Sequence, residues 1–397
     1  MPEVKDAENT VFYPETGETV WGEDAPLQWE RMASLPPVRT DREVTFTNSA
    51  AVDEILHRPE VFSSGPEAGY LGSEVALIPL QIDPPEHVRY RRMLDPLFAP
   101  KRMNALEHDI AALAVRCMDE FIERGSCDFS DEFSIPYPAG TFLRLLGLPM
   151  DGLAEFVQLK EDIIRPAGGD SPEGVATRER AGKQIASLFI AALTDRRKHR
   201  REDILSHFAQ LEASGDLNRD ESIGICHLLL IAGLDTVTGT LECAFALLAR
   251  RPDLRRSLAG RLDVIPSAVV ELLRWIVTSP VQTRIAVQDV EVQGFEVKKG
   301  EIVRAAQATM NFDPARIPDP LNVDFGREEN RHATFGIGIH RCLGSHLARL
   351  ELRIAMSEWH ARIPEYELGE DFVVKYTPAL RGVSHLALQF PPGRRAT

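Results

Sequence analysis

Residues 335–344 are FGIGIHRCLG, a glycine-bearing loop that leads directly into a helical pattern. Gly336 and Gly338 permit backbone angles that are closed to other residues, and they leave room for a large flat ligand. Beyond Cys342, apolar residues recur at steps of three and four over residues 347–354, which predicts a helix. A cysteine at a helix N-terminus faces unpaired N–H groups and the positive end of the helix dipole, which stabilise its thiolate. The loop therefore predicts a cysteine placed to bind a metal ion.

Two interpretations of Cys342 are open from this residue alone, because a free cysteine is often just a small buried apolar residue. The residues around Cys342 favour the interpretation that it is a metal ligand. Phe, Gly, Gly, His, Cys and Gly at these six offsets should arise by chance in on the order of one chain in a million. The stretch resembles the haem-binding loop of the cytochromes P450, whose pattern is Phe-x-x-Gly-x-[His or Arg]-x-Cys-x-Gly.

The resemblance implies a role for four residues of the loop. The cofactor would be haem b (iron protoporphyrin IX), with Cys342 as the axial thiolate ligand of the iron. His340 would contact a haem propionate, and Phe335 would pack close to the sulfur. Gly344 completes the pattern and belongs to the predicted cofactor site.

The composition predicts a soluble globular protein. The chain has 397 residues, of which 44% are hydrophobic and 26% charged, and its formal net charge is −15. The negative charge argues against nucleic acid and against an anionic membrane surface as partners. The longest apolar run, residues 228–234, is far shorter than a membrane span. Five cysteines without metal-finger spacing, and acidic residues 1–8 without an apolar signal core, indicate a reducing cytoplasm.

The N-terminal region predicts a short sheet and a long loop. Residues 38–40 and 44–47 are predicted strands on either side of a turn, and a short helix should follow from residue 48 or 49 to His57. Residues 62–82 predict a long loop that becomes apolar at 75–80, and long structured loops are more often functional than idle. In the cytochromes P450 the matching loop covers the distal side of the haem and helps to choose the substrate.

A helix should start after this loop, within DPPEHVRYRR at residues 83–92. Prolines near the first turn, with Asp83 as the predicted cap and Glu86 three residues on, indicate the start. His87 and Arg91 are four residues apart and therefore project from one face of this helix. From these two residues alone, that face could simply be a solvated basic surface. Beside the haem motif, the segment resembles the family helix whose His and Arg hold a propionate, and this is the role we predict.

Residues 104–210 predict a succession of amphipathic helices. The pattern is interrupted at residues 167–172, where glycines and a proline predict a mobile loop. A lid over a pocket would suit that position.

Residues 219–250 predict one long helix, apolar on nearly every side and hence central and buried. Gly233 costs roughly 1 kcal/mol relative to alanine inside a helix, so its small size should be required. The neighbours Asp235 and Thr236 are costly in an apolar centre unless they have partners or a catalytic task. From the residues alone, Thr236 could bond its own helix carbonyl and Asp235 could form a salt bridge.

The same helix resembles the oxygen-activation motif [Ala or Gly]-Gly-x-[Asp or Glu]-Thr of the cytochromes P450, at Ala232, Gly233, Asp235 and Thr236. The resemblance implies that Gly233 lets the helix lie against dioxygen at the haem. Thr236 would hydrogen-bond the oxygen that is being activated, and Asp235 would help to relay protons. Cleavage of an O–O bond needs protons and an electron-rich thiolate ligand, so the two motifs agree chemically.

Two weaker matches support the resemblance in combination. Glu271 and Arg274 match the Glu-x-x-Arg pair of the family, which is structural there. Arg284 follows at the position where the family commonly carries a propionate-binding arginine.

The resemblance extends over residues 38–391 and implies the P450 fold. We expect a mainly α protein, with a helical bundle and a small β-rich lobe that includes a hairpin at residues 290–297. Residues 1–397 should form a single haem-thiolate domain. The chain departs from the family at Phe312, where an arginine is usual, and this predicts a local change of packing below the haem.

The implied function is a haem-thiolate monooxygenase that inserts one oxygen atom of O2 into an apolar small molecule, by hydroxylation or epoxidation. Electrons would come from NAD(P)H through a ferredoxin and a ferredoxin reductase, because the chain has no flavin or iron–sulfur segment. The partner should dock near Cys342, where four basic residues could meet an acidic ferredoxin: Lys101, Arg102, Arg341 and Arg349.

Three alternative functions are less well supported by the sequence. Family members that use peroxide tend to lack the acid–alcohol pair, so Asp235 and Thr236 disfavour a peroxide-driven peroxygenase. The same pair argues against a non-catalytic haem sensor or carrier. A zinc protein built on Cys342 and His340 is least supported, because no further ligands follow at zinc spacing.

The substrate is predicted only as a class. By resemblance, residues 75–80, 230–233, 281–283 and 383–384 should line the pocket, with Gln282 and Ser384 as polar anchors. The individual substrate residues expected are Leu77, Ile78, Ile231, Ala232, Val281, Gln282 and Val383. These mostly aliphatic side chains suit a small or medium apolar molecule, such as a terpenoid, fatty-acid-like, aromatic or polyketide compound.

Overall fold

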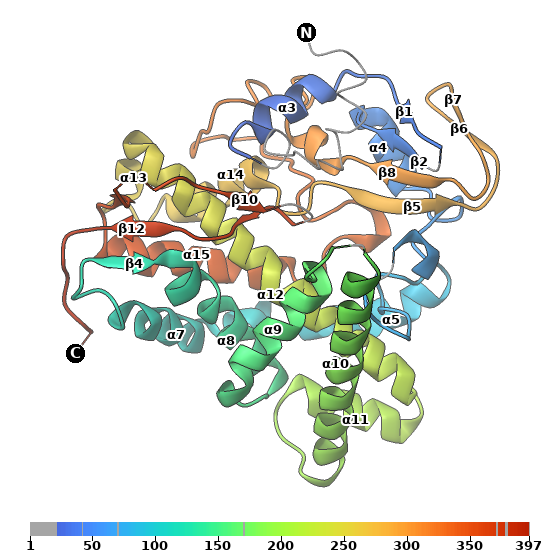
Figure 1. Ribbon diagram of the computed structural model, residues 1–397, viewed down its shortest axis with the longest axis horizontal. Coiled ribbons are helices and arrows are strands. Elements are labelled where there is room, and N and C mark those ends of the chain that lie inside the picture. Colours follow the sequence, from blue (N-terminus) through green and yellow to red (C-terminus); the bar gives the residue numbers. More distant parts are fainter. Residues whose placement is uncertain are drawn as a thin grey trace.

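The chain folds into a large helical region and a smaller lobe that is built around a sheet (Figure 1). The computed structural model describes residues 22–396, apart from residues 42, 70, 170, 371, 378 and 379. The acidic stretch at residues 1–8 lies outside the described residues. The predicted class, mainly α with a small β-rich lobe, is confirmed.

Helices make up most of the described chain. The α-helices are α3 (Ala25–Met32), α4 (Ser49–Leu56), α5 (Glu86–Leu94), α6 (Pro100–Asn104), α7 (Glu107–Asp119), α8 (Pro136–Leu146), α9 (Leu153–Ile164), α10 (Pro172–Lys198), α11 (Ile204–Ser214), α12 (Arg219–Arg250), α13 (Pro252–Leu258), α14 (Ile265–Ile276) and α15 (Ser345–Arg362). The strands are β1 (Val38–Arg39), β2 (Glu43–Phe46), β3 (Phe62–Ser63), β4 (Ser126–Asp128), β5 (Gln282–Ala286), β6 (Val290–Val292), β7 (Phe295–Val297), β8 (Ile302–Ala305), β9 (Glu367–Leu368), β10 (Tyr376–Thr377), β11 (Gly382–Val383) and β12 (Ala387–Gln389).

The lobe contains a five-stranded sheet in the order β1-β2-β8-β5-β3, in which β2 and β8 are parallel and the other neighbours antiparallel. Side chains such as Phe46 and Val303 give it a core of its own, separate from that of the helical region. Helix α4 begins after Asn48, whose side chain accepts hydrogen bonds from the N–H groups of Ala50 and Ala51. The predicted early strands, the short helix and the β6–β7 hairpin are confirmed.

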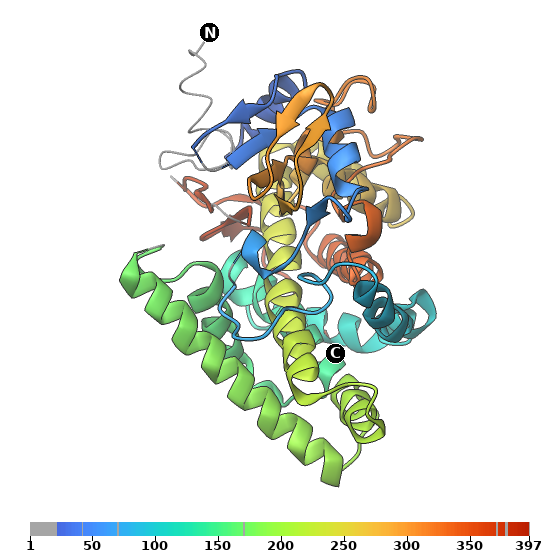
Figure 2. The ribbon, with the colours of Figure 1, turned by 90° about the vertical axis from the view of Figure 1, so that its right-hand side faces the viewer.

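Helix α12 runs through the centre of the helical region, and Figure 2 shows other helices along both of its sides. It begins with a capping box, in which the side chains of Asn218 and Glu221 accept from each other's backbone N–H groups. By length and hydropathy it is the one helix among the described residues that could cross a membrane, yet 72% of its most apolar window is buried inside the protein. These features are those of a core helix, with the bounds that the sequence predicts.

The predicted pair Glu271–Arg274 lies buried at the base of the cysteine loop. Arg274 donates to the two carboxylate oxygens of Glu271 at 2.8 and 2.7 Å, and to the backbone carbonyls of Asn311 and Pro320 at 3.1 and 2.9 Å. A buried ion pair is costly unless its remaining donors are bonded. Here the carbonyls of the incoming chain accept them, so the pair fixes the course of the segment that leads to the cysteine loop.

Phe312, which replaces the arginine of the family pattern, is completely buried. Its ring centre lies 5.4 Å from that of Trp29 on α3 and 5.6 Å from that of Trp275 on α14. An aromatic ring fills this apolar space, in which an additional cation would be desolvated. The changed packing is therefore located between α3 and α14.

Helix α5 does not begin as predicted. Its N-cap is Pro85, and no side chain caps it. The prediction that Asp83 caps this helix is wrong, because the carboxylate accepts hydrogen bonds from Ser63 and Ser64 of the preceding loop instead. The two serine hydroxyls and the N–H of Ser64 occupy the carboxylate of Asp83, so it does not bond to the first N–H groups of α5.

The connection between α9 and α10 is a turn at the predicted lid. Helix α10 begins after Ser171, whose hydroxyl oxygen accepts from the N–H of Gly174 at 3.3 Å. Residue 170 lies outside the described residues, and the mobility of residues 167–172 stays a prediction.

The loop of residues 62–82 lies directly on α10 and α12. A Cβ added at Gly182 of α10 would come within 1.6 Å of the carbonyl oxygen of Gly72, and one added at Gly224 of α12 within 2.2 Å of that of Ala76. The backbone of the loop therefore approaches both helices at positions without a side chain.

We expect Gly182→Ala to destabilise the protein by about 2 kcal/mol, although alanine is the better helix former. The new methyl group displaces the carbonyl of Gly72, so the loop must shift. Denaturant unfolding of the purified variant measures the effect. A gain in stability of about 1 kcal/mol, the usual result for glycine to alanine inside a helix, would contradict the close contact.

Candidate active site

A cavity of about 310 Å³ opens between α12, the cysteine loop (residues 335–344) and the start of α15. Far-separated parts of the sequence meet here, because α12 and the cysteine loop form different walls of one space. The predicted site residues that line it are Arg91, Ala232, Gly233, Thr236, Gln282, Phe335, His340, Cys342 and Gly344.

Several predicted substrate residues do not line this cavity, and these predictions are corrected: Leu77, Ile78, Ile231, Val281, Val383 and Ser384. Leu77 and Ile78 are buried in the helical core, and of the predicted segment 75–80 it is Pro79 and Leu80 that line the cavity. Val281 packs in the cluster of α3 and α14. Ser384 is exposed on the surface.

On α12 the lining residues form a stripe of helical spacing: Leu228, Leu229, Ala232, Gly233, Thr236, Val237 and Thr240. Ile231 lies off this stripe, whereas the next residue, Ala232, faces the cavity. Steps of three and four residues from Thr236 in both directions would have found the stripe.

Cys342 ends a tight loop whose shape depends on two glycines. Its N–H donates to the carbonyl of Phe335 at 2.7 Å, which closes the loop. Gly336 and Gly338 have φ angles of 72° and 68°, and a Cβ at Gly338 would lie 2.3 Å from the carbonyl oxygen of Leu56. Glycine is therefore required here by backbone conformation and by the close approach of α4.

The thiol of Cys342 is not made acidic by the helix terminus alone. Desolvation by the surrounding protein raises its pKa, although the residue is exposed to the cavity, and the N–H of Gly344 with the charges of Arg91 and Arg341 opposes this rise without reversing it. Helix α15 begins only at Ser345, beyond the cysteine. The predicted stabilisation of the thiolate by the helix terminus is thus incomplete, and a metal cation at the sulfur would supply the rest.

Protonatable and positive side chains gather around His340. The rings of His87 and His340 meet edge-on with centres 4.5 Å apart, and Nε2 of His87 is buried without a hydrogen-bond partner. Arg284 is 5% exposed and donates to the carbonyl of Thr283 at 2.7 Å; among the described residues, no carboxylate lies within ion-pair distance of it. Burial lowers the pKa of Arg284 to about 10. Burial, followed by the charges of Arg284 and His87, lowers the pKa of His340 to about 3.

This group of side chains fits the haem that the resemblance implies. An anion placed among them would receive a hydrogen bond from the orphaned His87 Nε2 and would offset the desolvated charge of Arg284. The two propionates of haem are such anions, and Cys342 lines the same cavity as a ligand for its iron. The residues present therefore match both the metal and the acidic groups of the cofactor.

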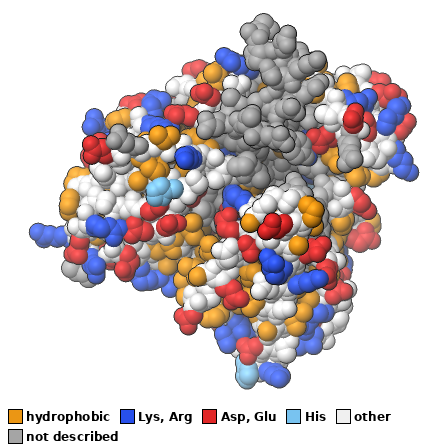
Figure 3. Space-filling view, in the orientation of Figure 1, with side chains coloured by type: hydrophobic (Ala, Val, Ile, Leu, Met, Phe, Trp, Pro, Cys, Tyr) orange, Lys and Arg blue, Asp and Glu red, His pale blue; other side chains and the backbone are white. Residues whose placement is uncertain are grey.

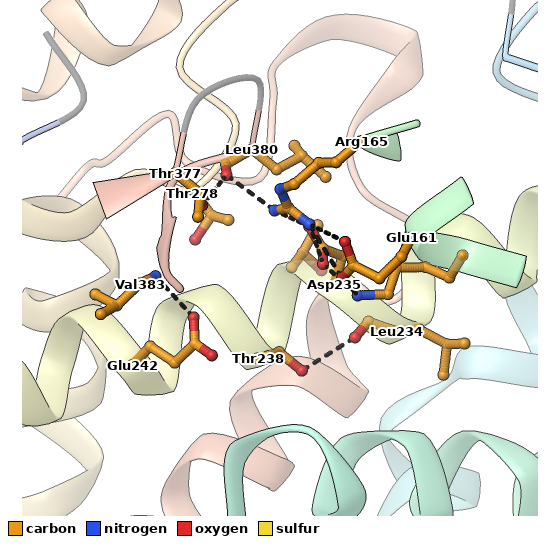
Figure 4. Close-up of polar contacts among 12 residues, drawn as sticks. Glu161, Arg165, Leu234, Asp235, Thr238, Glu242, Thr278, Thr377, Leu380 and Val383 are labelled. Atoms are coloured by element: carbon orange, nitrogen blue, oxygen red, sulfur yellow. Dashed lines mark hydrogen bonds and ion pairs between the residues drawn. The ribbon is translucent and has the colours of Figure 1, made fainter. Parts of the chain in front are cut away.

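The acid and the alcohol of α12 point in different directions. Thr236 lines the cavity, and its hydroxyl donates to the carbonyl of Ala232 at 3.0 Å. Asp235 does not line the cavity; it is bonded to Lys160 at 2.8 Å and to Arg165 at 2.8 and 3.1 Å (Figure 4). The salt bridge and the helix-carbonyl bond, which the residues alone left open, are therefore both formed.

The ion pairs of Asp235 decide its protonation. Burial raises its pKa, but the charges of Lys160 and Arg165 outweigh burial, and the pKa lies below its ordinary value. Glu161 completes the cluster through contacts with both cations. At neutral pH Asp235 is an ionised carboxylate, which can accept a proton.

Gly233 has a packing neighbour that the sequence did not indicate. A Cβ at this position would lie 2.8 Å from Cδ2 of Phe142 on α8. Gly233 also borders the cavity, but the close packing of α8 on α12 already requires its small size. The sequence predicts that Gly233 is small to make space for dioxygen, whereas the contacts explain its small size by the packing against Phe142.

Glu242 explains why Val383 does not reach the cavity. Its carboxylate accepts from the N–H of Val383 at 2.8 Å and from the hydroxyl of Ser134 at 3.2 Å, and Figure 4 shows it directed at Val383. These bonds hold β11 against α12. Burial raises the pKa of Glu242 to about 7, in spite of the hydrogen bonds that favour its ionised form.

Glu242 should make the stability of the protein fall as pH rises from about 5 to about 8. Its pKa is higher in the folded state than in the unfolded chain, so the stabilisation is complete below the unfolded pKa and is lost as pH passes the folded one. We expect Glu242→Gln, which cannot ionise, to remove about 3 kcal/mol of this pH dependence. Denaturant unfolding of both proteins at the two pH values measures the difference. The same slope in both proteins would contradict a titrating Glu242.

Sequence reasoning missed Lys160, Arg165 and Ser64. Lys160 lies on the buried face of α9 among apolar residues. A cation at such a position predicts a buried acidic partner. Arg165 and Ser64 carry no such signal, because their partners are distant in the sequence.

Comparison with known proteins gives concordant matches. A family model described as cytochrome P450 matches residues 177–359. The probable cytochrome P450 127A1 of Sinorhizobium fredii is 34% identical over 342 residues, which cover 84% of this chain and 80% of the relative. The steroid C26-monooxygenase of Mycolicibacterium smegmatis is 30% identical over 405 residues, which cover 98% of this chain and 96% of the relative. The crystal structure of CalO2 superposes with a TM-score of 0.88 at 27% identity, covering 96% of this chain and 99% of CalO2.

Proposed function

The chain belongs to the cytochrome P450 family, and on this premise we propose that it oxidises an apolar small molecule with electrons from a ferredoxin. It is a P450 monooxygenase with haem b as its cofactor. The observation that carries the proposal is the placement of the Cys342 thiol and the Thr236 hydroxyl on different walls of one cavity. A metal ligand and a hydrogen-bond donor on different walls of one cavity are the parts that oxygen activation needs.

The proposed cofactor site uses this chain's residues in two roles. Cys342 would hold the iron, and His87, Arg91, Arg284 and His340 would hold the propionates. Bound haem supplies the activation of O2, to which a thiolate ligand contributes electron density. Phe335 would pack beside the sulfur.

The distal residues would manage protons and water. Thr236 can turn its hydroxyl from the carbonyl of Ala232 into the cavity, where it donates to oxygen. Asp235 would accept a proton from the side of Lys160 and Arg165 and pass it inward. Leu80 and the aliphatic residues of α12 would limit the access of bulk water to the cavity.

The proposed ferredoxin surface lies near the cysteine loop. The face of the molecule in Figure 3 has acidic and basic side chains interspersed, so it offers no surface of one sign. Lys101, Arg102 and Arg341 are exposed. The guanidinium of Arg349 lies 4.4 Å from the ring centre of Phe335, so it would contribute its charge from behind this surface.

The substrate would be mainly apolar, with hydrogen bonds to a few groups of the cavity wall. Thr240, Thr278, Ser279 and Gln282 offer such groups among aliphatic neighbours. A relative is named as a steroid C26-monooxygenase, and an apolar ring system of that kind is one candidate class. A cytoplasmic location belongs to the same proposal.

Oxygen consumption tests the proposal. The purified protein is given NADPH with a surrogate ferredoxin and reductase, and candidate substrates are first chosen by the spin-state shift they cause. Substrate-dependent O2 uptake with an oxygenated product is expected. Product formed only with hydrogen peroxide would show a peroxygenase instead, and haem binding without either reaction would show a non-catalytic haem protein.

A further inference from the structure

We propose that Ser64 and Asp83 are positioning residues of the cofactor site, which hold the imidazole of His340 in the orientation in which it meets a haem propionate. The inference rests on the proposed function, because it takes His340 as a propionate-binding residue. Neither Ser64 nor Asp83 lines the cavity, so their effect would be transmitted through His340.

The carboxylate of Asp83 is bonded by two consecutive serines. It accepts from the N–H of Ser64 at 3.0 Å, from the hydroxyl of Ser64 at 3.1 Å and from the hydroxyl of Ser63. Ser63 and Ser64 are both buried. The carboxylate oxygens accept these bonds, so the hydroxyl protons of Ser63 and Ser64 both point towards Asp83.

The single hydroxyl proton of Ser64 determines how it meets His340. The Ser64 oxygen lies 3.0 Å from Nε2 of His340. Because this hydroxyl already donates to Asp83, its oxygen accepts from Nε2–H of His340, and Nδ1 is left as the ring nitrogen that would share a proton with a propionate when haem is bound. The chain Asp83–Ser64–His340 therefore fixes one face of the imidazole, and the His87 ring at 4.5 Å limits its tilt from another side.

Asp83 also joins the three segments that form this edge of the cavity. Its side chain holds the loop after β3, and its backbone carbonyl accepts from the N–H of His87 at 3.1 Å, at the start of α5. Through Ser64 it reaches His340 of the cysteine loop. One acid thus supports both histidines that are expected at the propionates. Partners of this kind, one step behind a ligand, commonly set its orientation.

Ser63 provides a matched control for Ser64. Its hydroxyl also donates to Asp83, and its oxygen accepts from the N–H of Gly65 at 2.9 Å, but the described contacts do not connect it to His340. Ser63→Ala and Ser64→Ala therefore remove the same group from the same acid, and only the second removes the bond to the imidazole.

The test is the rate at which the holoprotein loses haem to an excess of apomyoglobin. Ser64→Ala should speed the transfer about tenfold, Ser63→Ala should stay close to the wild type, and Ser64→Thr should restore retention. In a His340→Ala background, Ser64→Ala should have no further effect, because a residue that acts through His340 loses its influence when the imidazole is gone. The spectrum of the reduced carbon monoxide complex shows for each variant that the starting holoprotein is thiolate-ligated.

The outcomes separate this inference from the proposed function. If His340→Ala speeds haem loss but Ser64→Ala does not, the propionate role stands and the positioning role is overturned. If Ser64→Ala has the same effect with and without His340, the serine acts on the loop alone, and the inference is again overturned. If His340→Ala leaves haem loss unchanged, both assignments fall. Should Ser64→Ala not load haem, Asp83→Asn replaces it, with an expected rate between those of the wild type and His340→Ala.

Discussion

Cys342→Ala should abolish the red-shifted Soret band of the reduced carbon monoxide complex and reduce monooxygenase turnover to background. Cys342 is the one described cysteine that lines the cavity, so nothing replaces its sulfur. Any remaining haem would be held by its propionates and by apolar contact, without a thiolate. The expected spectrum has a Soret position typical of weak or histidine ligation, and absorption spectroscopy of the purified variant measures it.

A second cysteine serves as the control for this prediction. Cys117 lies half-buried on α7 and does not line the cavity. Cys117→Ala should therefore keep both the thiolate spectrum and turnover. A red-shifted band that survives in Cys342→Ala, or its absence from the wild type, would refute the assignment of the ligand.

Asp235→Asn should lower turnover by about a hundredfold while haem binding and the thiolate spectrum stay intact. The amide keeps the shape of the carboxylate but cannot pass on a proton. It also leaves Lys160 and Arg165 with Glu161 as the remaining carboxylate that they contact, and the loss of the buried counter-charge should destabilise the protein by about 3 kcal/mol. Substrate-dependent O2 uptake, product yield and the solvent hydrogen isotope effect measure the loss of turnover. Denaturant unfolding measures the loss of stability.

Asp203 gives a control with a similar environment and no link to the cavity. Its carboxylate is buried, lies 2.7 Å from the guanidinium of Arg196, and accepts from the N–H of Ser206. Asp203→Asn should cost a comparable amount of stability and leave the turnover of the folded enzyme unchanged. Equal losses of turnover in both variants would mean that Asp235 supports the fold and relays no protons.

Local features of the fold were predictable because their causes lie close together in the sequence. The bounds of α12 follow from its continuous apolar pattern and the start at Asn218, and the β6–β7 hairpin follows from alternation around Gly294. The cysteine loop was readable for the same reason, since the left-handed conformation of Gly338 and the position of Cys342 are set within ten residues. A pattern this dense also indicated the cofactor.

The side of an element that faces the cavity was not predictable to the residue. Residues 75–80 were expected to line it, with Leu77 and Ile78 singled out, and of this segment Pro79 and Leu80 do. Ile231 was expected, and the stripe through Ala232 and Thr236 is the one that faces inward. The rotation of a helix about its axis, and the course of a loop over it, depend on the neighbours packed against them, and these come from elsewhere in the chain.

The sequence by itself determined the family and the order of the helices and predicted the thiolate ligand, because each depends on residue types at short spacing. Tertiary structure alone decided which partners the charged residues have. Asp235 pairs with cations 75 and 70 residues away, and Asp83, which lies before α5, bonds to Ser64 and through it reaches His340. A buried charge takes whichever donors the packing brings within hydrogen-bond distance, and contacts between distant segments leave no periodic trace in the chain.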